Sequence, residues 1–309
     1  MMPRLTLFEL WLVFAGLCAL AAWVSYRRRA RARWPQVFFS FWGTLSGALV
    51  SRAGLAVLAG AALATWGLVA SGLDRDLQAW FQESDPLGRE FSRAFLVGGN
   101  YWHPLMGGLI LVWARVRHNR TLFAAAAAAL QAIIASGLVV NGLKWMTGRR
   151  GPGRIHFPDW SDPASFAFVR PFRKTHDPAD FSVDFWNHVF EDGRFFWPSG
   201  HTATAFAFAA AWTVTFFMLV RVHRPAGGGS VTGPATASAA RGSLNPLRRH
   251  GLAMLMAVVL WGTALVTGVA MIDGDFHWTS DVIAGAPLGA LIGLAVGRAF
   301  AGRENSGAQ

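Results

Sequence analysis

Cysteine is almost missing from this chain of 309 residues, because Cys18 is the only one. A single thiol cannot form a disulfide within the chain, and it excludes a metal site built from several thiolates. Charged residues are scarce as well: they make up 15% of the sequence, against 53% hydrophobic residues, and the mean hydropathy is +0.34. Such a chain is too apolar to be water-soluble at this length, and several segments near the length that crosses a bilayer explain the excess.

Acidic residues are the rarer of the two charged classes. The chain has 17 acidic and 28 basic residues, which gives a formal net charge of +11. In a membrane protein such an excess usually lies in cytoplasmic loops and does not require a nucleic-acid partner. We therefore expect the protein to lie in a lipid bilayer, and we expect no nucleic-acid partner.

The apolar segments predict an all-α fold, a polytopic membrane helix bundle of about seven spans. The expected spans cover residues 5–26, 53–72, 101–113, 121–144, 202–220, 251–271 and 281–300. Residues 34–51 form either an interfacial helix or an extension of the second span. The chain then divides into an N-terminal part (1–51), a membrane core (52–300) and a cytoplasmic tail (301–309). The sequence does not indicate the oligomeric state.

Basic residues predict the orientation of these spans. The arginine cluster at residues 27–33 directly follows the first span, and the linker at 221–250 is basic and rich in Gly, Ser, Pro and Ala. Both are expected in the cytoplasm, whereas the long polar loop at 148–197 is expected outside. The sequence therefore predicts a multi-pass protein of the inner (plasma) membrane whose polar loop faces the periplasm or exterior.

Three polar clusters are predicted to meet at that outer end of the bundle. Lys144 ends the fourth span, Ser199-Gly200-His201 opens the fifth, and residues 273–281 join the sixth to the seventh. Two crossings separate His201 from His277, so both histidines are expected on the same side of the membrane.

The residue types in these clusters suit phosphate chemistry. A helix start collects unpaired N–H groups and favours an anion, and His201 in that first turn can exchange protons near neutral pH. His277 and Asp281 are four residues apart, on one helix face, so the carboxylate can fix the imidazole tautomer and leave one nitrogen free to attack. A simple helix-capping histidine, a polar pair at a helix entry and a pair of metal ligands are the alternatives. A metal site would need further ligands at short spacing, and the sequence shows no such set.

Taken together, these motifs resemble the type 2 phosphatidic acid phosphatase superfamily, which includes the vanadium haloperoxidases. Its three blocks read Lys-x6-Arg-Pro, Pro-Ser-Gly-His and Ser-Arg-x5-His-x3-Asp. Lys144 and Pro152 match the first block in spacing, Pro198-Ser199-Gly200-His201 completes the second, and His277 with Asp281 matches the third. The resemblance extends over about residues 52–300 and implies a six-helix core with one extra N-terminal span.

The resemblance implies hydrolysis of a lipid phosphomonoester or diphosphate without a metal or other cofactor. His277 would attack phosphorus and form a phosphohistidine, Asp281 would orient His277, and His201 would act as the acid and then as the base. The substrate would be a membrane lipid phosphate. The implied phosphate-binding residues are Lys144, Arg150, Arg149, Ser199 and Gly200.

Two arginines of the family pattern are replaced in this sequence. Gly151 stands at the first-block position, and Met271 stands at the third-block position. Arg150, one residue away, is the leading substitute, followed by Arg149. The replacements keep open an alternative function, that of a catalytically impaired relative that binds lipid headgroups or a protein. A transporter is disfavoured because ionisable residues near mid-membrane are few, and a soluble haloperoxidase is disfavoured by the spans.

Overall fold

The computed structural model describes residues 41–147, 149, 151–152, 196–222 and 246–306, and within these ranges the regular secondary structure is entirely helical. This confirms the predicted all-α class. The helices, in chain order, are α3 (Phe41–Val50), α4 (Arg52–Ala70), α5 (Leu73–Ser84), α6 (Arg89–Val116), α7 (Arg120–Thr147), α9 (Gly200–Val222), α11 (Pro246–Asp273) and α12 (Thr279–Ser306).

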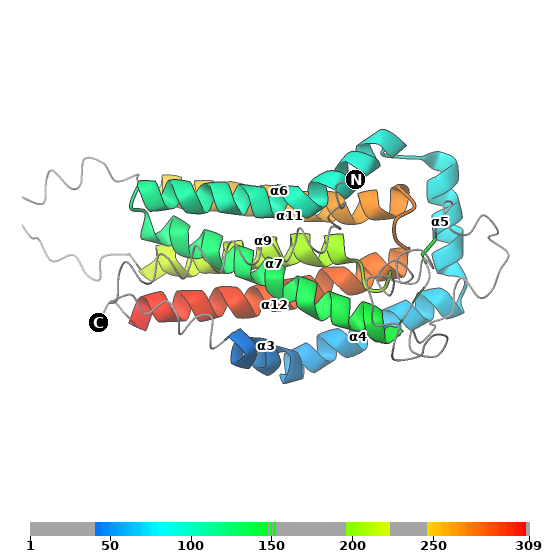
Figure 1. Ribbon diagram of the computed structural model, residues 1–309, viewed down its shortest axis with the longest axis horizontal. Helices are drawn as coiled ribbons and strands as arrows, with labels where there is room; N and C mark the ends of the chain where they lie inside the picture. Colours follow the sequence, from blue (N-terminus) through cyan, green and yellow to red (C-terminus); the bar gives the residue numbers. More distant parts are fainter. Residues whose placement is uncertain (1–40, 148, 150, 153–195, 223–245, 307–309) are drawn as a thin grey trace, which may run out of the picture.

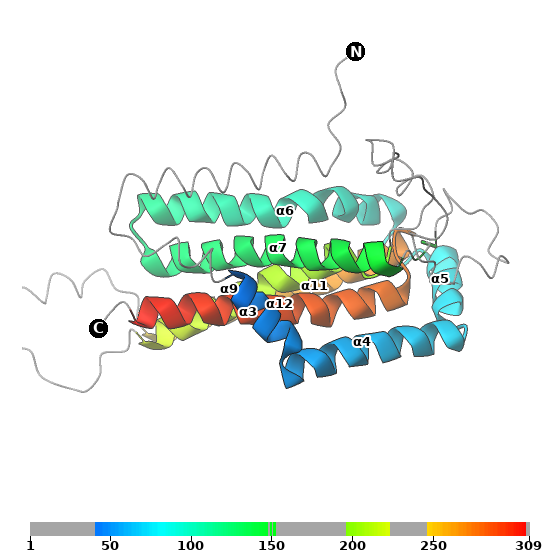
Figure 2. The same ribbon diagram turned by 60° about the horizontal axis from the view of Figure 1, so that its bottom comes forward.

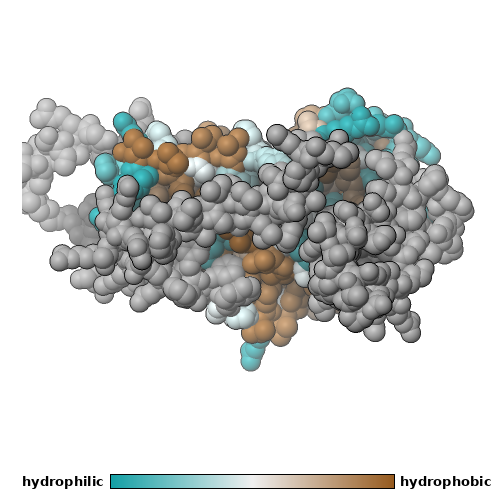
Figure 3. All heavy atoms as spheres, in the orientation of Figure 1, coloured by the Kyte–Doolittle hydropathy of each residue, from teal (hydrophilic) through white to brown (hydrophobic). Residues whose placement is uncertain are grey.

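The helices α6, α7, α9, α11 and α12 run side by side along the long axis, and α5 lies across one end of them (Figures 1 and 2). The core lies where α9 packs between α7 and α12, and it consists largely of alanine, with larger side chains such as Phe208, Trp212 and Ile292. Along the visible flank of α6, hydrophilic residues gather towards the two ends and hydrophobic residues lie between them (Figure 3). This distribution suits a bundle whose middle lies in lipid.

Four of the described helices are long and apolar enough to cross a membrane, which indicates a membrane protein. The four stretches are Arg52–Ala70, Arg120–Lys144, Ala253–Asp273 and Thr279–Gly302. They correspond to the second, fourth, sixth and seventh predicted spans. The predicted bundle of seven is not confirmed: the first span, at 5–26, lies outside the described residues, and α6 and α9 are not among the four.

Two boundaries differ from the sequence prediction. The third span was expected to start at residue 101, but α6 starts at Arg89 and has 28 residues. Its polar first turns continue the helix because the bundle supplies partners for them: Ser92, for example, is fully buried and donates to Asp273 of α11 at 2.7 Å. Residues 41–50 form α3, a separate helix, because Ser51 caps α4 by accepting the Gly54 N–H at 3.0 Å.

A glycine every fourth residue lets α12 and α9 approach each other closely. The set is Gly285, Gly289, Gly293 and Gly297. A Cβ atom at Gly285 would lie 2.6 Å from the Ser199 carbonyl oxygen, and one at Gly297 would lie 2.8 Å from that of Ala211. Small residues spaced in this way are a common means of close helix packing in membranes. Here the contact brings the beginning of α9 against the beginning of α12.

The close approach predicts a large effect of one methyl group at Gly289. A Cβ there would overlap the backbone of Ala203, whereas one at Gly302, in the same helix, would meet nothing within 4 Å. We expect Gly289→Ala to lower the free energy of unfolding by at least the 1–3 kcal/mol or so typical of overpacking, and Gly302→Ala to have little effect. Thermal unfolding in detergent measures both, and equal melting temperatures for the two variants would contradict the contact.

Candidate active site

The three predicted polar clusters lie together at the end of the bundle that α5 covers. The Thr147 hydroxyl at the end of α7 donates to the Trp197 carbonyl at 3.2 Å, just before α9. The Ser199 N–H donates to the Asp281 carbonyl of α12 at 3.0 Å. These bonds join the end of α7 to the beginnings of α9 and α12. The prediction that the clusters converge at one end of the bundle agrees with this geometry.

His277 is held in the short connection between α11 and α12. The chain reverses through Asp275, which has a φ of 62°. The N–H groups of Phe276 and His277 then both donate to the Met271 carbonyl, at 3.0 and 2.9 Å. These bonds use a carbonyl that the end of α11 would otherwise leave unpaired. They fix the backbone of His277 just beyond the end of that helix.

Asp281 binds the His277 side chain, which is the contact that the four-residue spacing predicts, but His277 lies before the start of α12 and not on the same helix face. Its Oδ2 atom lies 3.2 Å from His277 Nδ1 and accepts the Trp278 N–H at 3.0 Å. A carboxylate that reaches back to the N–H at a helix start is one half of a capping box, and it is favoured there by the helix dipole. Both side chains are buried. With Nδ1 engaged, the Nε2 atom of His277 remains for chemistry.

Burial shapes the protonation of this histidine. Desolvation lowers the pKa of His277 below its usual 6.5, and the nearby Lys144 and Arg149 charges act in the same direction. The hydrogen bond to Asp281 opposes this shift without cancelling it. His277 is therefore mainly neutral at pH 7, the form in which an imidazole nitrogen is a nucleophile.

His201 lies across from His277, with ring centroids 6.5 Å apart. It occupies the first turn of α9, where Ser199 acts as the cap: the Ser199 hydroxyl accepts from the N–H and the hydroxyl of Thr202, at 3.4 and 3.0 Å. Lys144 approaches from α7, and its Nζ atom lies 3.8 Å from where a Cβ on Gly200 would be. Two imidazoles, an ammonium group and a helix start thus surround one small region.

Arg149 is fully buried and bound to two carboxylates. Its Nη1 atom donates to Asp281 Oδ1 and to Ser280 Oγ, both at 2.5 Å, and its Nη2 atom donates to Asp74 Oδ2 at 2.6 Å. In this arrangement Arg149 supports the far side of Asp281. That Arg149 also binds phosphate stays a prediction, and Arg150, the leading predicted substitute, lies outside the described residues.

Sequence reasoning missed the contribution of α5 to this site. Asp74 is fully buried and accepts from the Ser280 N–H at 2.9 Å and from the Ser280 hydroxyl at 2.5 Å. Gln78 and Gln82 both donate to Asp275 Oδ1, at 2.9 and 2.5 Å. The signal was present: these three residues are spaced by four and share one face of the helix.

The two positions where the resemblance expects arginine are occupied by packed groups. A Cβ atom on Gly151 would lie 2.5 Å from the Phe196 ring, which also packs edge-on against His277 at 5.6 Å between centroids. Met271 is fully buried. An aromatic ring and a thioether thus fill space at these positions, and a longer, charged side chain at either of them would have to displace its neighbours.

Comparison with known proteins agrees with this geometry. A protein-family model described as the PAP2 superfamily matches residues 125–304, more than half of the chain, and the chain belongs to this superfamily. Its members are generally phosphatases or related hydrolases. Neither a curated protein nor a solved structure gives a match. The match begins inside α7, so α5 and α6 lie before it.

The burial of Arg149 predicts a strong effect on stability. Removing a buried charge from its partners leaves Asp74 and Asp281 uncompensated, so Arg149→Met should lower the free energy of unfolding by about 3–5 kcal/mol. Arg93, whose ion pair with Glu90 at 2.8 Å is exposed, provides the control, and Arg93→Met should change it by less than about 1 kcal/mol. Thermal unfolding in detergent compares the two, and an Arg149→Met protein as stable as the parent would contradict the buried pairing.

Proposed function

We propose that the chain is a membrane phosphatase that hydrolyses a phosphomonoester or diphosphate of a lipid through a phosphohistidine at His277. The observation that carries this proposal is the buried His277–Asp281 pair facing His201 across 6.5 Å. The Asp281 carboxylate fixes the tautomer of His277. A phosphoryl group bound between the two rings would have its leaving oxygen next to His201. Membership in the PAP2 superfamily supports the same chemistry.

In the first step, the Nε2 lone pair of His277 forms a bond to phosphorus, and the bond from phosphorus to the leaving oxygen breaks. His201 donates a proton to that oxygen, so the lipid leaves as a neutral alcohol or as a protonated phosphate. The negative charge of a bound phosphate favours the protonated form of His201 that this step needs. Asp281 stabilises the positive charge that develops on His277.

In the second step, water attacks the phosphohistidine. His201, now neutral, accepts a proton from the water as the new oxygen–phosphorus bond forms. The nitrogen–phosphorus bond breaks, the electron pair returns to His277, and inorganic phosphate is released. The cycle returns both histidines to their starting forms and consumes one water molecule.

Phosphate binding is assigned to the groups that converge on the helix start. Lys144 supplies a positive charge beside Gly200, and the start of α9 favours an anion because the first N–H groups of a helix lack partners within the helix. Arg150 is the proposed two-pronged donor, because it lies one residue from the family position and two residues before Pro152. Arg149 is the second candidate and would have to bind phosphate while it holds Asp281.

The substrate class follows from where the site lies. The candidate spans in α7, α11 and α12 all end or begin at this site, so reacting groups meet at one end of the apolar part of the bundle. A lipid phosphate can present its headgroup there while its acyl or prenyl chains stay in the bilayer. We propose that this end faces the periplasm or exterior of an inner membrane.

A second candidate function is that of a relative with little or no turnover that binds headgroups or a protein partner. The observation that favours it is the packing at Gly151 and Met271, which leaves neither position able to present an arginine to phosphate. Loss of such donors removes interactions that stabilise the transition state. Turnover of a lipid phosphate by the purified protein separates the two functions.

The chemistry predicts a pattern of loss among the histidines. Phosphate release is measured with EDTA present against phosphatidate, phosphatidylglycerol phosphate, a polyprenyl diphosphate and a lipid A phosphate. His277→Ala should abolish turnover of whichever lipid the parent hydrolyses, and His201→Ala should slow it by roughly 10²–10⁴-fold. The control is His118→Asn, an exposed residue with a φ of 51°, a conformation that asparagine tolerates. Full activity of the His277→Ala protein, or loss with EDTA that added metal restores, refutes the phosphohistidine mechanism.

The proposed orientation makes a separate prediction. Single cysteines are introduced into a Cys18→Ser background, either at 153–195 in the long polar loop or at 223–245 in the basic linker. A membrane-impermeant maleimide added to intact cells should label the first set only, because the positive-inside rule places the linker in the cytoplasm. Permeabilised cells, in which both sets should react, are the control. Labelling of the linker and not of the loop in intact cells would reverse the orientation.

A further inference from the structure

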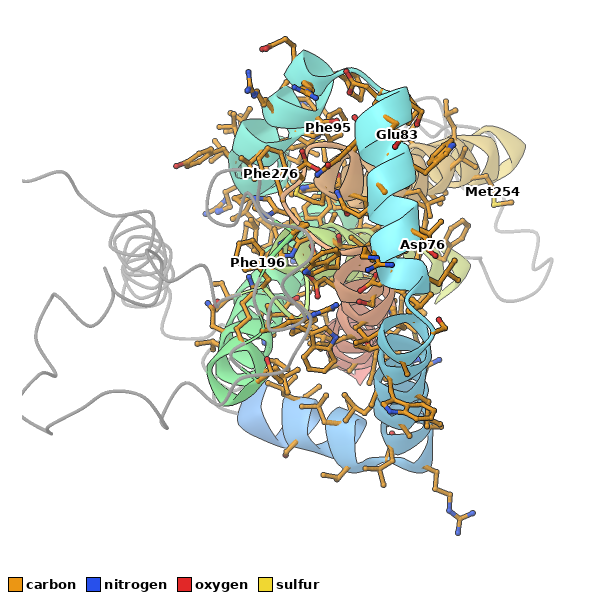
Figure 4. All side chains as sticks on the ribbon, turned by 90° about the vertical axis from the view of Figure 1, so that its right-hand side faces the viewer. Asp76, Glu83, Phe95, Phe196, Met254 and Phe276 are labelled. Carbon is orange, nitrogen blue, oxygen red and sulfur yellow. The ribbon has the colours of Figure 1, made fainter. Side chains whose placement is uncertain are left out.

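The helix α5 makes two separate connections to the segment that carries His277. Figure 4 looks onto this end of the bundle and shows α5, with Asp76 and Glu83 labelled, crossing in front of the other helices. Asp74 binds Arg149 and Ser280, at the beginning of α12. One turn further along, Gln78 donates to the Ile272 carbonyl and to Asp275, both at 2.9 Å, at the end of α11.

These connections reach both sides of His277. On one side, the glutamines of α5 hold the turn at Asp275 that places the His277 backbone. On the other side, Asp74 holds Arg149, and Arg149 holds the Oδ1 atom of Asp281, whose Oδ2 atom faces His277. The carboxylate of Asp281 therefore has both oxygens engaged, and it has no freedom to rotate away from the imidazole.

Burial of the Asp74 carboxylate is unfavourable unless its oxygens are fully hydrogen-bonded. A carboxylate removed from water must recover its hydration energy from nearby donors. Asp74 does so with one guanidinium nitrogen, one backbone N–H and one hydroxyl, which together come from the segment after α7 and from the beginning of α12. The other acidic residue of that turn, Asp76, has a side chain 67% exposed and takes no part in this network.

We propose that Asp74 and Arg149 are positioning residues for catalysis, which act through Asp281 to hold His277 in its attacking geometry. The proposal rests on the proposed phosphatase function, and it assigns to α5, outside the matched family region, a direct part in the reaction site. This role requires neither residue to touch the reacting atoms. Their effect is on the orientation of the Asp281 carboxylate and on the charge that His277 experiences.

The first test is the kinetics of Asp74→Asn with the lipid phosphate that the parent hydrolyses. Asparagine keeps the size of the side chain but pairs weakly with Arg149, so Asp281 loses its fixed support. We expect kcat to fall about 10- to 100-fold, the range typical when the groups that orient a reacting residue are disturbed, with KM nearly unchanged. Asp76→Asn, on the same helix, should leave both constants within about twofold of the parent.

The second readout is the pH profile, which a merely structural role for Asp74 would not move. Within the described part of the chain, the charged and titratable groups that act on His277 are Lys144 of α7, Arg149, His201 of α9, Asp281 of α12 and, behind Arg149, Asp74 of α5. Removing the Asp74 charge makes these surroundings more positive and disfavours protonated His277. The acid limb of kcat/KM, where His277 becomes protonated, should therefore move to lower pH in Asp74→Asn and stay in place in Asp76→Asn.

A milder variant covers the case in which Asp74→Asn fails to fold. Ser280→Ala removes the hydroxyl that joins Asp74 to Arg149 but keeps every charge and the backbone N–H bond to Asp74. It should lower kcat by about 3- to 10-fold, and the acid limb should not move. Size-exclusion chromatography and thermal unfolding in detergent establish which variants are folded.

Binding of orthovanadate, a mimic of pentacoordinate phosphorus, gives a readout without turnover. Asp74→Asn should weaken it about 10-fold, and Asp76→Asn should not.

A folded Asp74→Asn protein with parental kcat and pH profile overturns the proposal, as does parental kcat in Ser280→Ala when Asp74→Asn is unfolded. If the parent binds orthovanadate but hydrolyses none of the lipids, the proposed phosphatase function is wrong. The positioning role is then tested only by comparing the orthovanadate affinities of the variants with that of the parent. A parent that does neither overturns both.

Discussion

The site depends on one buried cation held between two buried carboxylates. Arg149 has no exposed surface, and neither have Asp74 and Asp281, so the cost of removing three charges from water must be met by their mutual attraction and by the added bonds from Ser280. That requirement ties together three segments distant in sequence: α5, the residues after α7 and the beginning of α12. None of the three can shift without leaving a charge unpaired. The geometry of the His277–Asp281 pair is a product of this constraint.

Packing of small residues brings the remaining part of the site to the same place. The glycines of α12 that face α9 allow backbone contact along most of the shared length, and this contact sets Ser199 beside Asp281. The alanine-rich core between α7 and α9 does the same for Lys144. Apolar packing thus determines which helix ends lie next to each other, and the ionic network determines the orientation of the side chains at those ends.

The sequence predicted the all-α class and the convergence of the polar clusters well, because both follow from hydrophobic run length and from counting crossings. It also predicted the His277–Asp281 contact from the spacing of four residues, although the shared helix face that it assumed is wrong: His277 lies before α12, and Asp281 reaches back to it from the first turn of that helix. The part played by Asp74 could not be predicted in the same way. Its partners are 75 and 206 residues away, so the local sequence does not identify them. The length of α6 was misjudged for a related reason, since the partner that buries Ser92 comes from α11.

The connection between α5 and the site also bears on where the functional unit of this chain begins. The family model starts at residue 125, inside α7, yet a carboxylate that neutralises Arg149 comes from residue 74. A fragment cut to the matched boundary would keep both histidines and Asp281, but it would leave the buried Arg149 guanidinium with only one of its two carboxylates. Boundaries drawn from shared sequence therefore understate the smallest piece of this protein that can assemble its own site.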